Sequence, residues 1–127
     1  MRKYLKSIVI ALIILILSLI PTNQINDTQL INVPHADKIV HFCMYAFLAF
    51  ILYYESYCIK KYHTIFLITA TSMVVSYGFI IELLQKFATQ YRSFELADAF
   101  VNTLGAIAGS LFFHFILRKL LIRQTTL

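Results

Sequence analysis

Four long apolar stretches dominate this chain and leave little room for anything except membrane-spanning helices. They predict spans at about residues 4–20, 37–57, 64–87 and 96–118, with short connections between them. A helix needs about 20 residues to cross a hydrocarbon core that is about 30 Å thick. The sequence therefore predicts an all-α membrane protein, with one domain over residues 1–127 that forms a bundle of four transmembrane helices.

The composition supports this prediction, because 60% of the residues are hydrophobic and only 13% are charged. A soluble domain is roughly 45–50% apolar. The first stretch could be a signal peptide, since Arg2, Lys3 and Lys6 precede the apolar run Ile8–Ile20, but no cleavage site with small residues follows. We therefore expect an uncleaved first helix. Because it consists almost wholly of Ile, Leu and Val, we expect it to form a lipid-facing wall without a polar stripe.

The positions of Lys and Arg predict the orientation of the bundle, because cytoplasmic segments are enriched in these residues. One side would hold only Lys38, Lys86 and Arg92. The other side would hold Arg2, Lys3, Lys6, Lys60, Lys61, Arg118, Lys119 and Arg123. Both termini are therefore expected in the cytoplasm. This topology accounts for the net charge of +5, so the charge does not imply a nucleic-acid partner.

Polar side chains gather at the opposite, outer edge of the predicted bundle. Asp37 and His41 are four residues apart at the start of the second span, and Asp98 and Asn102 have the same spacing at the start of the fourth. This spacing places each pair on one helix face. Polar groups are costly in a membrane, so such a cluster is a functional-site hypothesis. Its members are Asp37, Lys38, His41, Glu82, Gln85, Arg92, Asp98 and Asn102.

Some of these residues also have a purely structural explanation. Asp37 and Asp98 suit the first turn of a helix, and Asn102 could bond a neighbouring helix. His41 could be a packing residue, and Glu55 is most simply a solvated residue near a helix end.

Glu82 resists this kind of explanation, because a carboxylate is disfavoured near the C-terminal end of a helix. It needs a cation, for which Lys86 and Arg92 are the candidates. We expect Arg92 to reach back to Glu82, to Asp98 or to both.

Small residues in the fourth span predict a close helix contact. Gly105 and Gly109 have a GxxxG spacing, which lets the backbone of another helix approach. The contact could lie inside the bundle or in a homodimer, and in a four-span protein we favour the internal contact. No motif for a cofactor, a metal or a catalytic nucleophile is present in the sequence, so none of these is expected.

The order of the polar residues resembles that of the VanZ-like family of small bacterial multi-pass membrane proteins. The resemblance covers about residues 37–109. The matching pieces are Asp37-Lys38-x-x-His41-Phe42, Glu82-x-x-Gln85, Arg92, Asp98-x-x-x-Asn102 and Gly105-x-x-x-Gly109. The resemblance implies a place in the bacterial plasma membrane. It also implies lowered susceptibility to teicoplanin, a lipoglycopeptide with a lipid tail that binds cell-wall precursor at the outer leaflet.

Three functions are compatible with these observations. The first is a non-catalytic envelope protein whose outer polar site binds membrane lipid, a lipid-linked cell-wall precursor or a lipoglycopeptide. The second is a membrane enzyme in which Glu82 or Asp98 and His41 act as acid–base groups and Arg92 stabilises an oxyanion. The third is a small drug exporter, although such a carrier needs a carboxylate near the bundle midplane.

Overall fold

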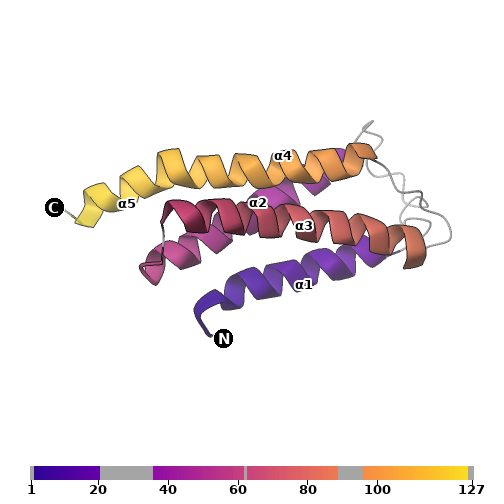
Figure 1. Ribbon diagram of the computed structural model, residues 1–127, viewed down its shortest axis with the longest axis horizontal. Helices are drawn as coiled ribbons and strands as arrows, with labels where there is room; N and C mark the ends of the chain where they lie inside the picture. Colours follow the sequence, from indigo (N-terminus) through magenta and orange to yellow (C-terminus); the bar gives the residue numbers. More distant parts are fainter. Residues whose placement is uncertain (1, 21–35, 62, 89–95, 126–127) are drawn as a thin grey trace.

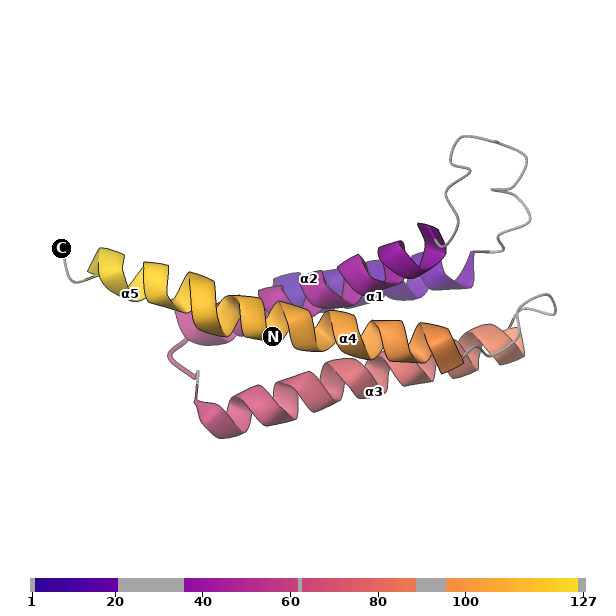
Figure 2. The same cartoon turned by 90° about the horizontal axis from the view of Figure 1, so that it is seen from above.

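The computed structural model describes residues 2–20, 36–61, 63–88 and 96–125, and these residues are helical almost throughout. The helices are η1 (Arg2–Tyr4, a 3-10 turn), α1 (Leu5–Leu19), α2 (Ala36–Cys58), α3 (Thr64–Ala88), α4 (Leu96–Phe112), η3 (Phe113–Leu117, a π-helix) and α5 (Arg118–Thr125). They lie along one long axis, and α4, η3 and α5 form one continuous rod (Figures 1 and 2). The all-α prediction is confirmed for the described residues.

Three of the helices are long and apolar enough to cross a membrane: α2, α3 and the rod from Leu96 to Leu120. Their outward side chains include Ile65 and Met73, which are 71% and 70% exposed. Large apolar side chains in such numbers on a surface require hydrocarbon rather than water, so the chain is a membrane protein. The α1 helix is apolar but has only 15 residues, which corresponds to about 22 Å. A fourth span therefore remains a prediction.

The closest helix contact is between α2 and α4, at the two glycines of the GxxxG motif. A Cβ atom on Gly105 would lie 2.4 Å from the carbonyl oxygen of Phe42, and one on Gly109 would lie 2.0 Å from that of Ala46. Only glycine fits at such distances, because the two backbones are in direct contact. The glycine face is thus used inside the chain, so a homodimer would need a different surface.

The half of the bundle that contains Cys58 has an aromatic core. Phe113 is fully buried and stacks on Tyr53, with ring centroids 6.2 Å apart. Phe50 packs edge-on against Phe113 at 5.9 Å. These rings join α2 to η3 and hold this half of the rod in place.

The α1 helix presents several exposed apolar side chains, which fits the expected lipid-facing wall, but the prediction that it has no polar stripe was wrong. Ser7, Ile14 and Ser18 are buried, since spacings of seven and four residues place them on one helix face. The hydroxyl of Tyr77 on α3 donates a hydrogen bond of 2.5 Å to the carbonyl of Ala11. Small serines within an Ile- and Leu-rich run therefore mark a packing face.

Glu55 is another residue for which the sequence was misleading, because it is buried rather than solvated. Its carboxylate accepts hydrogen bonds from the backbone N–H of Lys6 at 2.9 Å and of Ser7 at 3.0 Å. The Ser7 hydroxyl donates a third, at 2.5 Å. The first N–H groups of a helix lack partners within the helix, and its positive end favours a carboxylate. Glu55 on α2 therefore caps α1.

Candidate functional site: a polar cluster at the end of the bundle

Apart from Arg92, the predicted polar residues lie on three helices that meet at one end of the bundle. They occupy the first two turns of α2, the last two turns of α3 and the first two turns of α4. In Figure 1 these helix ends lie together, opposite the end at which η1 begins and α5 finishes. The structure thus separates the polar cluster from the two chain termini by the length of the bundle.

Asn102 is the centre of the cluster. Its amide nitrogen donates a hydrogen bond of 3.1 Å to Oε1 of Glu82, and its Oδ1 lies 3.1 Å from Nδ1 of His41. Because Asn102 donates on the Glu82 side, its oxygen must accept from His41, so Nδ1 of His41 carries the proton. Nδ1 also lies 3.6 Å from Glu82 Oε1. All three side chains are buried, and together they tie α2, α3 and α4 to one another.

A path from this buried centre to the surface runs through His41 to Asp37. Nε2 of His41 lies 3.7 Å from Oδ1 of Asp37, one turn earlier on α2. The Asp37 side chain is 55% exposed, whereas that of His41 is 4% exposed. A buried imidazole therefore links a buried carboxylate to an accessible one.

Lys38 and Asp98 form an ion pair between α2 and α4. Nζ of Lys38 lies 2.7 Å from Oδ1 of Asp98. Asp98 is buried, while the Lys38 side chain is 30% exposed. The Lys38 side chain therefore remains partly accessible at the surface, next to the exposed Asp37.

Gln85 extends the cluster to α1. Its amide nitrogen donates a hydrogen bond of 2.8 Å to the carbonyl of Ser18. This carbonyl lies in the last turn of α1, where the backbone oxygens lack partners within the helix. Gln85 therefore anchors the end of α1.

Arg92 lies outside the described residues, so its expected contact with Glu82 or Asp98 stays a prediction. Lys86, the other candidate cation for Glu82, is exposed in the last turn of α3. In the described part of the chain, Glu82 is held by the amide of Asn102 and faces the imidazole of His41. The side chains of His, Cys, Asp and Glu in this part do not gather in a group that could hold a metal.

Tyr45 belongs to this region and was not predicted from the sequence. It is fully buried one turn below His41, and its ring lies against Gly78, where an added Cβ atom would be 3.0 Å from Cε1 of Tyr45. Within the described residues its hydroxyl meets no hydrogen-bond partner, and the same holds for the hydroxyl of Ser18. The signal available in the sequence was the spacing of four residues from His41, which places both side chains on one face.

Comparison with known proteins gives one match. The model of the VanZ/LLP1 family matches residues 3–118, a stretch that includes α1 as well as the residues of the polar cluster. Neither the curated proteins nor the solved structures gave a match. The family match covers most of the chain, and the matched range includes every described residue of the polar cluster. This membrane protein therefore belongs to the VanZ/LLP1 family.

Proposed function

We propose that this protein is a non-catalytic component of the bacterial plasma membrane that binds a lipid-linked or acyl-bearing envelope molecule through its polar cluster. Binding would lower susceptibility to teicoplanin-type lipoglycopeptides. The observation that carries the proposal is the grouping of Asp37, Lys38 and Asp98 beside a buried His41–Asn102–Glu82 network. The exposed Asp37 offers a hydrogen-bond acceptor, and the partly exposed Lys38 offers a cation. The buried side chains hold these two in position.

The distribution of basic residues along the bundle supports this proposal. The described basic residues Lys3, Lys6, Lys60, Lys61, Arg118, Lys119 and Arg123 belong to the segments at the end remote from the cluster. An excess of Lys and Arg favours the cytoplasmic side. With the termini and α5 in the cytoplasm, and with α1 as a fourth span, the cluster would meet the outer leaflet. Lipid-linked precursors and the lipid tail of teicoplanin are found in that leaflet.

A second candidate is a membrane enzyme that acts on a lipid-linked envelope substrate, and the geometry of His41 favours it specifically. Nδ1 of His41 is fixed as a donor, so Nε2 can accept a proton on the side of the exposed Asp37. A positioned imidazole with one fixed nitrogen is the usual form of a general base. Glu82 or Asp98 would be the carboxylate partner, but the buried part of the network has no described opening toward a substrate.

The proposal is tested by expressing the wild-type protein in a teicoplanin-sensitive host and measuring susceptibility to teicoplanin and to vancomycin. Vancomycin binds the same kind of precursor but lacks the lipid tail. Tolerance to teicoplanin alone would support recognition of an acyl-bearing molecule. Equal tolerance to both drugs would point to a general change in the envelope, and no tolerance would remove the main support.

A further inference from the structure

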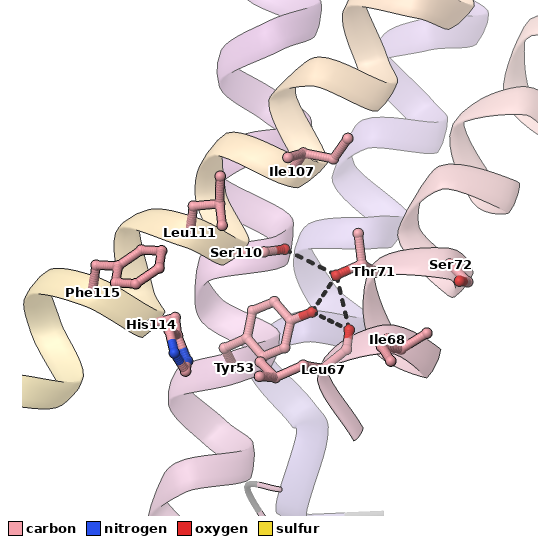
Figure 3. A pocket seen from close by; sticks show the side chains of 10 residues that line it. All are labelled: Tyr53, Leu67, Ile68, Thr71, Ser72, Ile107, Ser110, Leu111, His114 and Phe115. Carbon is pink, nitrogen blue, oxygen red and sulfur yellow. Dashed lines mark hydrogen bonds between the residues drawn. The ribbon is translucent and has the colours of Figure 1, made fainter. Parts of the chain in front are cut away.

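A second surface feature lies between α3 and the α4–η3 rod, displaced from the polar cluster toward η3. It is a groove with a cavity volume of about 500 Å³. Figure 3 shows its rim, to which Ile68, Ile107, Leu111 and Phe115 contribute. All four side chains are exposed, and they lie on helices long and apolar enough to span a membrane. The groove therefore opens into hydrocarbon.

The lining of the groove is mostly apolar, and three of its hydroxyl groups are hydrogen-bonded to one another. The hydroxyls of Tyr53, Thr71 and Ser110 point toward one another (Figure 3). Tyr53 and Thr71 share a hydrogen bond, and Thr71 lies 3.2 Å from Ser110. The Tyr53 hydroxyl also donates to the carbonyl of Leu67, at 2.6 Å. Three of the hydroxyl groups that line the groove are thus already hydrogen-bonded, and most of the lining surface is apolar, although Ser72 and His114 also line it. Such a surface suits an alkyl chain better than a polar molecule.

The groove coincides with the π-helix η3, which interrupts the rod at Phe113–Leu117. The backbone N–H of Arg118 bonds to the carbonyl of Phe113, five residues earlier. Short π-helical segments are rare and are frequent at functional sites. Here the segment brings His114 and Phe115 to the groove while Phe113 stays in the core.

A cation lies at the expected depth for a lipid phosphate. Ser110 is level with Thr71, and α3 and α4 run in opposite directions. Arg118, eight residues after Ser110, is therefore about level with His63, just before the start of α3. This is the edge of the membrane-spanning part. A guanidinium has five N–H donors, so Arg118 can bind a phosphate in addition to the contacts it makes within the chain.

We propose that this groove is a binding site for an anionic glycerophospholipid, with one acyl chain between α3 and η3 and the phosphate at Arg118. Charge complementarity determines the occupant. Arg118 lies four residues after His114, which lines the groove, so a cation follows the groove by about one helical turn along the same rod. This combination fits a molecule with a long alkyl chain and an anionic head. The site lies in the leaflet on the side of α5. It is independent of the polar cluster and of the function proposed for that cluster.

The absence of tryptophan from the chain allows a direct test. The variant Phe115→Trp places a single fluorophore on the groove. The control Phe112→Trp places it on the same rod at similar exposure, beside Gly109 and facing α2 instead. Each variant is reconstituted in mixed vesicles of phosphatidylglycerol and phosphatidylcholine, in which either one or the other lipid carries brominated, quenching acyl chains.

Brominated phosphatidylglycerol should quench the Phe115→Trp reporter about five times more effectively than brominated phosphatidylcholine at equal mole fraction, relative to the Phe112→Trp control. This is the preference expected from one cation at about 1 kcal/mol. Adding Arg118→Gln should abolish the preference, whereas Arg123→Gln on the same helix should retain it. Adding Ser72→Phe, which fills the groove, should also abolish it, and Ser76→Phe, one turn away, should not.

Equal preference at the two reporters would overturn the proposal, because it would mean that the basic end attracts anionic lipid without a defined site. A preference that survives Arg118→Gln would overturn the role of that residue. Circular dichroism of each variant shows whether the fold is retained, and the control substitutions carry the same changes in size and charge.

Discussion

Nδ1 of His41 lies 3.1 Å from Oδ1 of Asn102, and this contact fixes the position of a proton in the centre of the polar cluster. The Asn102 amide donates to Glu82 and leaves its oxygen to accept from His41. One asparagine thereby sets the tautomer of the histidine and joins three helices. The cluster is a cross-linked unit rather than a group of separate polar residues.

Replacement of Asn102 should therefore destabilise the bundle. Asn102→Ala leaves both the Glu82 carboxylate and the His41 N–H without their amide partner, and should reduce the free energy of unfolding by about 1–2 kcal/mol. Thr103→Ala is the control, because within the described residues the Thr103 hydroxyl bonds only to the carbonyl of Ala99 in its own helix. Titration with dodecyl sulfate in detergent measures the free energy of unfolding of both variants. Equal losses of stability in the two variants would show that the hydrogen-bond network contributes nothing specific.

Gly109 and Gly78 should differ strongly in their tolerance of alanine. A Cβ atom at position 109 would collide with the Ala46 carbonyl oxygen at 2.0 Å, so α2 and α4 would have to separate. A Cβ atom at position 78 would meet the Tyr45 ring at 3.0 Å, and a side chain can move more easily than a backbone. Gly109→Ala should lower the free energy of unfolding by several kcal/mol, which is more than the 1–3 kcal/mol typical of overpacking. Gly78→Ala should lower it by about 1 kcal/mol. The reverse order in unfolding measurements would contradict the close crossing of α2 and α4.

The cap that Glu55 provides for α1 is open to an equally specific test. Glu55→Gln removes the charge and presents an amide to the N–H groups of Lys6 and Ser7, and should cost about 1 kcal/mol. Hydrogen exchange at these two amides should accelerate, while exchange in the middle of α3 stays unchanged. Uniform acceleration throughout the chain would indicate a general loss of stability instead of a lost cap.

The predicted topology can be tested with single cysteines. Both native cysteines, Cys43 and Cys58, are exposed and are first replaced by alanine. In this background a membrane-impermeant maleimide should label Asp37→Cys in intact cells, because position 37 is exposed at the end of the bundle that the predicted topology places outside. Lys61→Cys should react only after permeabilisation. The opposite pattern would place the polar cluster in the cytoplasm.

The sequence predicted α2, α3 and the rod from Leu96 to Leu120 well, because each of them comes from a predominantly apolar run that is long enough to cross a membrane. It was less informative about α1, where Ser7 and Ser18 form a packing face within a run of Ile and Leu. The composition of this run does not reveal that the serines share one helix face. Glu55 was misread for a related reason, since its partners Lys6 and Ser7 are remote in sequence.

The spacing of Asp37 and His41 was sufficient to place them on one face, because that relation lies within one helix. Contacts between side chains on different helices could not be predicted in this way. The contacts Lys38–Asp98 and Asn102–Glu82 depend on how far each helix is shifted along its neighbour. That shift is set by the contact of Gly105 and Gly109 with α2, which spacing in the sequence does not specify.

The most direct test of the central claim is teicoplanin susceptibility of cells that express Lys38→Gln, compared with wild type and with the control Lys61→Gln at matched membrane levels. Lys38 is a partly exposed cation in the polar cluster, and Lys61 is an exposed cation at the other end of the bundle. We predict that Lys38→Gln abolishes the tolerance to teicoplanin that the wild type confers, whereas Lys61→Gln retains it. Full tolerance with Lys38→Gln, or equal loss in both variants, would contradict recognition of an envelope molecule by the polar cluster.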